Sequence, residues 1–277
     1  MNQVSIVNSS CNAVTQADTV TGITTKQVQI LHGYFNVITI EETVDWAAQL
    51  IQLGHQGYVC TVNVAILMMM SRNLRLQQFI KNAALVVADG QPIVWASQWL
   101  ARPLPERVTG IDLIDALAKR AEQERFRVYL LGGSQEVIQV AAANLQSKYP
   151  RLDICGYDDG YFSPAEARDR VKAIRQSGAQ ILFVGMGVPR QEFFLEEHWL
   201  DLGVNLAIGV GGSFDVNAGL KKRAPDWVQE AGLEWLYRLL QEPKRLWKRY
   251  LVTNLQFTYY LFREMLRMAF LEPTSRI

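Results

Sequence analysis

Short apolar runs and amphipathic stretches alternate along most of the chain. The apolar runs occupy residues 57–63, 84–90, 127–133, 152–157, 180–187 and 205–212, and most end in glycine or a polar residue. Stretches with helical spacing separate them, at 41–54, 64–83, 111–124, 135–148, a segment opened by the capping box Ser163-Pro164-Ala165-Glu166, and 190–200. Because strands that alternate with helices form parallel sheets, we predict an α/β fold with a mostly parallel sheet and helices on both faces.

The pattern differs at the two ends of the chain. Residues 28–40 predict a short β-hairpin. Residues 1–22 are rich in Ser, Thr and Asn and lack the basic and apolar segments of a signal peptide, so we expect them to be disordered. After residue 220 only helical patterns occur, at 224–243 and 244–270. We therefore predict an α/β body over 23–220 and a helical appendage over 221–277.

Charge separates the appendage from the body, although the whole chain carries only +1. Leu220–Ile277 holds 11 Lys and Arg against 6 Asp and Glu, so the rest of the chain is acidic. At about 100° per residue, Arg245, Arg249, Arg263 and Arg267 form a stripe beside an aromatic and aliphatic face. Such a helix suits an anionic membrane surface or a diphosphate, or it is a core-packing helix with a solvated basic edge. Nucleic acid is not expected as a partner, because the body is acidic.

Polar residues at the ends of predicted strands are the first site candidates. Ligands bind beyond the carboxyl ends of strands in open α/β sheets. Thr61 and Asn63 end one run and Asp89 ends the next. Asp89 could act as a general base on an attacking hydroxyl, with Thr61 and Asn63 orienting a polyhydroxylated ligand. The alternative for Asp89 is a cap of the helix that follows, and the alternative for Thr61 and Asn63 is capping of the strand end.

Two glycine segments could approach a ligand closely. Gly132 lies in LLGGSQE, where the backbone could cradle a phosphate or simply form a turn capped by Ser134. Gly211 and Gly212 lie in GVGGSFD, and Asp215 follows, where a carboxylate could accept hydrogen bonds from a ribose or base. The spacing GxGxxG is absent, which argues against an NAD-dependent oxidoreductase. No metal-binding motif occurs, and we expect neither a metal nor another cofactor.

Taken together, the motifs resemble one family. TVN, ADG-x-P, RVTG-x-D, LLGG, DGYF, GMG-x-PRQE, GVGGSFD, RAP-x-W, GLEW-x-YR and EP-x-R follow one another in order. This series is similar to the bacterial WecG/TagA/CpsF family of glycosyltransferases, from about residue 30 to 250. The resemblance implies a Rossmann-like sheet with a mobile C-terminal appendage. It also implies inverting, metal-independent transfer of a sugar from a UDP-sugar to a polyprenyl-diphosphate-linked saccharide in cell-surface polysaccharide synthesis.

The resemblance also implies roles for particular residues. Asp89 matches the general base, and Thr61, Asn63, Arg107 and Gln191 match residues of the same pocket. Asp215 and Tyr161 fall in motifs expected to touch the nucleotide. The set matched to the departing diphosphate lies in the appendage and comprises Arg238, Arg245, Lys248 and Arg249. Where the family has a further basic residue, this chain has Lys248 beside Arg249, so either could make that contact.

The resemblance sets further expectations for location and partners. The implied donor sugar is N-acetylmannosamine, its uronic acid or glucose. The implied location is the cytoplasmic face of the bacterial plasma membrane, as a peripheral protein held by the C-terminal helices. A homo-oligomer is compatible with the sequence. A non-catalytic, nucleotide-binding scaffold at the membrane surface is the competing interpretation.

Overall fold

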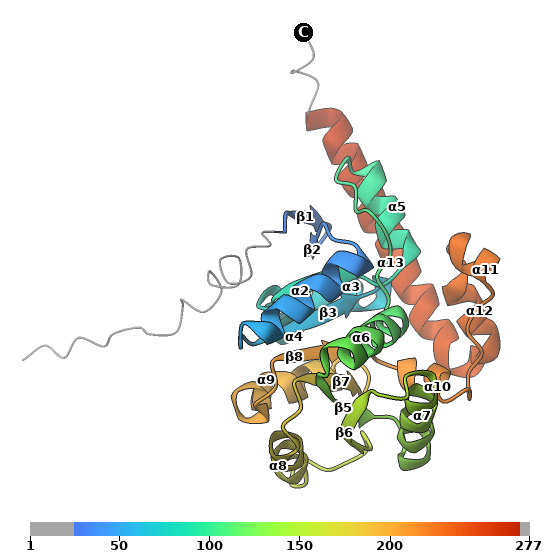
Figure 1. The fold of residues 1–277 in the computed structure, drawn as a ribbon. Helices are drawn as coiled ribbons and strands as arrows, with labels where there is room; N and C mark the ends of the chain where they lie inside the picture. The colour runs from blue at the N-terminus through green and yellow to red at the C-terminus, as the bar shows by residue number, and fades with distance from the viewer. Residues whose placement is uncertain (1–24, 272–277) are drawn as a thin grey trace, which may run out of the picture.

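The computed structural model describes residues 25–271, without the side chains of residues 226, 230, 245, 249 and 271. Its centre is a six-stranded parallel sheet in the order β4-β3-β8-β7-β5-β6 (Figure 1). The strands are β3 (Gly57–Val62), β4 (Leu85–Ala88), β5 (Arg127–Gly132), β6 (Asp153–Asp158), β7 (Ile181–Gly185) and β8 (Leu206–Gly209). The predicted α/β fold is therefore confirmed. The segment 1–22, for which disorder was predicted, lies outside the described residues.

Helices cover both faces of the sheet and create two apolar cores. Alternate strand residues point to opposite faces, so Val59 enters one core while Cys60 and Val62 enter the other. The core of Val59 is covered by α2 (Ile40–Gln52), α6 (Gly110–Glu124), α7 (Gln135–Lys148) and α10 (Ser213–Asn217). The core of Cys60 is covered by α3 (Val64–Met70), α4 (Leu74–Lys81), α5 (Gln91–Trp99), α8 (Ala167–Ser177) and α9 (Arg190–Leu202).

The predicted hairpin is confirmed and protects one edge of the sheet. β1 (Gln27–Ile30) pairs antiparallel with β2 (Gly33–Asn36). The buried side-chain oxygen of Asn36 accepts a hydrogen bond from the backbone N–H of Val86 on edge strand β4, at 2.8 Å. Pairing and covering edge groups in this way prevents edge-to-edge association of sheets.

The chain leaves neighbouring strands β3 and β8 toward opposite faces. β3 continues into α3 in one core, and β8 continues into α10 in the other. In doubly wound sheets, such a switch opens a crevice beyond the carboxyl ends of the two strands. Asn63 follows β3, and Gly211 and Gly212 follow β8, so three of the site candidates selected from the sequence lie at this switch.

Two helix boundaries differ from the prediction. The stretch 64–83 was predicted as one helix, but it forms α3 and α4, because the Asn73 side chain accepts the N–H of Leu76 and starts a new helix there. The helix expected from Ser163 begins only at Ala167. Glu166 does accept the Ser163 N–H at 2.8 Å, but residues 164–166 form a turn ahead of the helix.

Only helices follow β8 in the described chain. They are α10, α11 (Asp226–Glu230), α12 (Glu234–Gln241) and α13 (Pro243–Leu271). The stretch 224–243 was predicted as one helix, and it breaks at Gly232, whose φ of 67° is left-handed. Figure 1 shows α13 running from beside α12 toward the end of the molecule where α5 and the hairpin lie.

Candidate active site

Asp89 and Asn63 follow neighbouring strands and lie beside the switch crevice. The register pairs Val62 with Ala88, and the Asp89 N–H donates to the carbonyl of Val62 at 2.9 Å. The Asn63 side-chain oxygen accepts the N–H of Ile66 at 3.1 Å and caps α3, so the capping alternative holds for this oxygen. α5 begins after Gly90 without a side-chain cap, so Asp89 is not used in that way. The capping alternative therefore does not hold for Asp89.

Thr61 joins the two strands that flank the switch. Its hydroxyl donates to the carbonyl of Gly209, at the end of β8, at 2.8 Å. The side chain is buried, with an exposed fraction of 8%. Thr61 therefore fixes the floor of the crevice, and its hydroxyl proton is already engaged.

Charged groups from three parts of the chain set the protonation of Asp89. Burial raises the pKa of Asp89 to about 6, although its side chain keeps some solvent access. The positive charge of Arg238 opposes this rise in pKa, and the negative charge of Glu234 adds to it. More weakly, Arg107 lowers the pKa of Asp89 and Asp112 raises it. A carboxylate with a pKa near 6 is suited to accept a proton at neutral pH.

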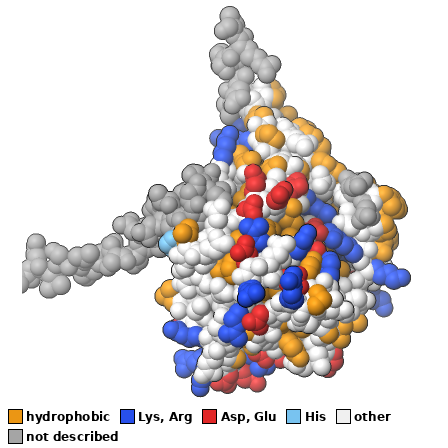
Figure 2. All heavy atoms as spheres, viewed as in Figure 1, with side chains coloured by type: hydrophobic (Ala, Val, Ile, Leu, Met, Phe, Trp, Pro, Cys, Tyr) orange, Lys and Arg blue, Asp and Glu red, His pale blue; other side chains and the backbone are white. Residues whose placement is uncertain are grey.

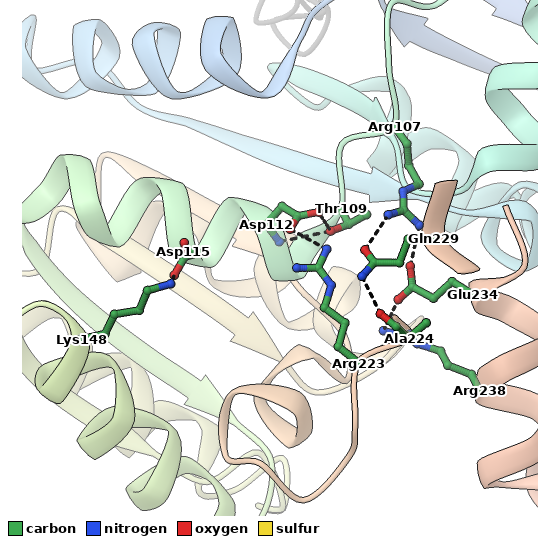
Figure 3. A network of polar contacts seen from close by, with 10 residues as sticks. All are labelled: Arg107, Thr109, Asp112, Asp115, Lys148, Arg223, Ala224, Gln229, Glu234 and Arg238. Atoms are coloured by element: carbon green, nitrogen blue, oxygen red, sulfur yellow. Dashed lines mark hydrogen bonds and ion pairs between the residues drawn. The ribbon is translucent and has the colours of Figure 1, made fainter. Parts of the chain in front are cut away.

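Glu234 of the appendage bridges Arg107 and Arg238, the two arginines whose charges lower the pKa of Asp89. The Arg107 guanidinium contacts its carboxylate at 2.5 Å, and Arg238 contacts the other oxygen at 3.6 Å (Figure 3). Arg107 and Glu234 each expose only 14% of the side chain. Arg107 also donates to the side-chain oxygen of Gln229 at 3.2 Å. The body and the appendage therefore meet in a largely desolvated polar network.

A second ion pair joins the appendage to the start of α6. Thr109 caps α6 by accepting the N–H of Asp112, and its hydroxyl donates to the Asp112 carboxylate at 2.7 Å. The other carboxylate oxygen contacts Arg223 at 2.6 Å (Figure 3). Figure 2 shows acidic and basic side chains crowded together on this face of the molecule. The motif RVTG-x-D thus supplies both contacts that position the appendage here.

Gln191 forms the buried floor next to Thr61. Its side-chain oxygen accepts the Gly211 N–H at 3.1 Å, and its side-chain nitrogen donates to Glu192 at 2.8 Å. A Cβ at Gly209 would lie 2.6 Å from that nitrogen, so any other residue there would force the buried Gln191 side chain to move. Gln191 thus ties the end of β8 and the following glycine loop to α9.

Glu192 is a second carboxyl group in this floor, and the sequence analysis did not select it. It is 6% exposed, and burial raises its pKa to about 7, against the lowering effect of the hydrogen bond from Gln191. Its other oxygen, Oε2, is buried without a hydrogen-bond partner. Its place directly after Gln191 in the PRQE motif was the one available signal.

The glycine segments divide between two places. Gly211 (φ 55°) and Gly212 follow β8 at the crevice. Gly132 ends β5, where a Cβ would lie 2.4 Å from the Gly185 carbonyl. Ser134 accepts the N–H of Val137, which confirms it as the cap of α7. Four strand spacings of about 4.8 Å separate β5 from β4, so Gly132 lies well away from Asp89.

The two predicted nucleotide contacts are placed differently. The Asp215 carboxylate contacts Lys221 at 2.5 Å, and Lys221 also contacts Glu242 at 3.3 Å. The carboxylate of Asp215 is therefore engaged by the appendage. Tyr161 follows the outermost strand β6, and its side chain is 76% exposed. Asp215 therefore borders the crevice, whereas Tyr161 lies at the far side of the same sheet edge.

The predicted diphosphate set is only partly described. Arg238 lies within reach of Glu234, as above. Lys248 is exposed on α13, with its ammonium 5.5 Å from the Trp247 ring. Arg245 and Arg249 lie on α13, but their side chains are outside the described part of the structure. Their proposed contacts remain predictions.

Metal and membrane features can be assessed only within the described residues. There, no three His, Cys, Asp or Glu side chains gather in a metal-binding arrangement. Within residues 25–271, no helix has an apolar stretch long enough to cross a bilayer. The use of a metal is not tested by the first observation.

The crevice, its perturbed carboxylate and the arginines around it suit transfer of a group from a phosphate-bearing donor to a hydroxyl. In agreement with this, residues 28–270 match the glycosyl transferase WecG/TagA/CpsF family, and the chain belongs to that family. It is therefore a glycosyltransferase.

Among curated proteins, it is similar to N-acetylglucosaminyldiphosphoundecaprenol N-acetyl-beta-D-mannosaminyltransferase of Bacillus spizizenii strain W23. The two are 34% identical over 195 residues, which are 70% of this chain and 75% of the relative.

Proposed function

We propose that the protein transfers N-acetylmannosamine, or a closely related sugar, from a UDP-sugar to a polyprenyl-diphosphate-linked saccharide. The observation that carries this proposal is the carboxylate of Asp89, with a pKa near 6, beside two arginines at the switch crevice. The name of the Bacillus relative supports the sugar and the lipid-linked acceptor. The pathway in which it acts is the synthesis of a cell-surface polysaccharide.

In the proposed step, the acceptor hydroxyl oxygen attacks the anomeric carbon from the side opposite the diphosphate. A new C–O bond forms, the bond from that carbon to the diphosphate oxygen breaks, and the configuration inverts. Asp89 takes the hydroxyl proton, which increases the nucleophilicity of the oxygen as the bond forms. UDP leaves with the electron pair of the broken bond.

Positive charge from the appendage stabilises the departing diphosphate in this mechanism, without a metal. In the appendage the candidates are Arg238, with Arg245, Lys248 and Arg249 as further ones, and Arg107 of the body lies beside Arg238 at Glu234. Preorganised charges of this kind stabilise a transition state by about 2–4 kcal/mol each. In this structure Glu234 contacts both Arg107 and Arg238. Diphosphate oxygens and the Glu234 carboxylate would therefore compete for the same guanidinium donors.

The exposed face of α13 supports a place at the membrane surface. Leu255, Tyr259 and Phe262 expose 64%, 62% and 61% of their area. These residues recur at helical spacing, and Phe270 continues the stripe, at 77% exposed. An interfacial helix with basic residues beside such a stripe binds anionic bilayers. We place the protein peripherally on the cytoplasmic face, where lipid-linked acceptors and UDP-sugars meet.

The test is release of UDP by the purified full-length chain. It is supplied with polyprenyl-diphosphate-linked N-acetylglucosamine and a panel of UDP-sugars, with chelator present. We expect release with one donor, dependent on the lipid, and a loss of about 10²–10⁴-fold in Asp89→Asn. No release with any donor, together with vesicle binding that Asp89→Asn leaves unchanged, would instead favour a non-catalytic scaffold at the membrane.

A further inference from the structure

A cavity of about 440 Å³ lies between the β1–β2 hairpin and the distal half of α13. Its lining comprises Gln29, Leu31, His32, Arg102, Tyr260, Arg263, Glu264, Arg267 and Met268. None of these residues belongs to the site around Asp89. Arg263 is 20 residues beyond the start of α13 at Pro243, which is about 30 Å along a helix. The cavity therefore lies far from the start of α13 and shares no residue with the proposed reaction centre.

The cavity concentrates positive charge. Arg102, Arg263 and Arg267 line it together with one acidic residue, Glu264. Arg102 donates to the backbone carbonyl of Gln29 at 2.8 Å, and the Arg263 guanidinium lies 5.3 Å from the centre of the Tyr260 ring. In the part of the chain that the structure describes, no ion pair is formed by these three arginines. A concave site with uncompensated guanidinium groups attracts an anion.

His32 adds a polar atom that lacks a partner. Its ring meets the Tyr260 ring edge-on, with centroids 4.8 Å apart, and its Nε2 is buried without a hydrogen bond. Burial lowers the pKa of His32, Arg263 lowers it further, and Glu264 opposes them. Leaving a buried polar atom unpaired costs free energy. A ligand oxygen in the cavity would supply the missing partner.

The position of the cavity indicates which anion would reach it. Arg263 and Arg267 come from the same helix as the exposed apolar stripe of Phe262 and Leu266, which are 61% and 41% exposed. A helix lying with this stripe in a bilayer would hold the cavity at headgroup depth. Guanidinium groups bind phosphate through paired N–H donors.

We propose that this cavity is a binding site for a phosphate ester, supplied by an anionic phospholipid headgroup or by a soluble phosphate ester. Arg263 and Arg267 would contact the phosphate oxygens, Arg102 would hold the hairpin side of the site, and His32 Nε2 would share a hydrogen with the ligand. Only the lipid source rests on the proposed membrane location of the enzyme. The site would anchor the far end of α13 while Asp89 serves the reaction.

Vesicle co-sedimentation tests the lipid source. The full-length chain is mixed with phosphatidylcholine vesicles, with or without phosphatidylglycerol. Arg263→Gln is expected to weaken binding to the phosphatidylglycerol vesicles about fivefold, as for one basic residue at such a surface. His32→Phe keeps the ring against Tyr260 and removes no positive charge at neutral pH, and we expect a similar loss from the missing hydrogen bond.

Lys244→Gln is the matched control, because Lys244 is an exposed cation on α13 outside the cavity. Its effect is expected to be smaller than that of either cavity variant. Circular dichroism and the melting temperature establish that each variant is folded. Asp89→Asn should bind these vesicles like the parent chain, so failure of the catalytic proposal remains distinguishable from failure of this one.

Calorimetry with glycerol 3-phosphate, without vesicles, tests the soluble source. Binding that is lost in Arg263→Gln and His32→Phe and kept in Lys244→Gln supports a soluble phosphate ester as ligand. If Arg263→Gln and His32→Phe lose binding and Lys244→Gln keeps it only with phosphatidylglycerol vesicles, the ligand is the phospholipid headgroup. The proposal is overturned if no phosphate ester binds and Lys244→Gln weakens vesicle binding as much as Arg263→Gln while His32→Phe has no effect.

Discussion

The α/β body and the helical appendage are held together in different ways. The body buries two apolar cores, and several of its helices begin at side-chain caps, such as Thr39 before α2 and Thr109 before α6. The appendage buries fewer apolar residues: Ala224, Val228, Leu246, Phe257 and Leu261 are buried, and none lies in α12. Most stability of a helix in a protein comes from packing an apolar face. We therefore expect the body to fold by itself, whereas the appendage depends on the surface that it covers.

The contacts between the two regions are of two kinds: Phe257 and Leu261 of α13 pack into the core of Cys60, and charged groups meet at the candidate site. Arg107 meets Glu234, and Asp112 meets Arg223. The charge of Arg238 also opposes the rise in the pKa of Asp89, a residue of the body. The appendage thus contributes chemistry to a site whose framework the body supplies.

Removal of the appendage is the largest test of this division. A chain ending at Leu220 is expected to lose turnover entirely, because Arg238 and the further basic residues are absent, while the body stays folded. UDP release measures the first effect, and circular dichroism with thermal unfolding measures the second. Asp89→Asn in the full-length chain is the control for an inactive but complete protein. Full activity of the shortened chain would contradict the assignment of these residues to the reaction.

A single appendage arginine tests the electrostatic link. Arg238→Gln is expected to lower kcat/KM by about 10²-fold or more, from a loss of about 2–4 kcal/mol at the transition state. It should also move the acidic limb of the pH profile to higher pH. The parent limb is expected near pH 6, the pKa of Asp89, with activity rising as the carboxyl ionises.

The matched control for Arg238→Gln is Lys244→Gln, which removes an exposed cation from the same appendage. It should leave the limb in place. A limb that moves equally in both variants would show a general charge effect and no specific link between Arg238 and Asp89.

Glu192 tests the body alone. Its pKa in the folded protein is raised to about 7, so folding is favoured while the carboxyl is protonated, and that advantage is lost as the pH rises through 7. Glu192→Gln should therefore raise the melting temperature at pH 8 and leave it nearly unchanged at pH 4. Turnover should change by only a few-fold, because glutamine can still accept the hydrogen bond from Gln191. If Glu192→Gln raised the melting temperature at pH 4 and not at pH 8, the pKa of Glu192 would not be raised in the folded protein.

Thr61→Val is expected to have the smallest effect. It removes the hydroxyl that donates to the Gly209 carbonyl, at a cost of about 1 kcal/mol in the free energy of unfolding. Turnover should fall as well, because this bond fixes the crevice floor. Thr43→Val is the matched control: its buried hydroxyl donates to the Thr39 carbonyl, in α2 away from the crevice. Equal effects of the two variants on turnover, after chemical denaturation establishes their stability, would remove Thr61 from the site.

Local sequence patterns determined much of this molecule. The apolar runs, the hairpin, the Ser134 cap and the place of Asp89 after β4 each follow from residues within a few positions of one another. The ordered motifs also identified the family, and residues 28–270 match it. The local pattern was insufficient where two signals competed. Helical spacing continued through Asn73, but its side chain capped a new helix, and residues 164–166 formed a turn despite the capping box.

Tertiary structure alone decided which distant groups meet. It placed Glu234 against Arg107, left Glu192 buried with one unpaired oxygen, and closed a basic cavity between the hairpin and α13. It also separated Gly132 and Tyr161 from Asp89 across the sheet edge. The physical reason is that strand patterns and helix caps depend on neighbours in sequence, whereas strand order and helix docking set the distance, burial and charge on which ion pairs and pKa values depend.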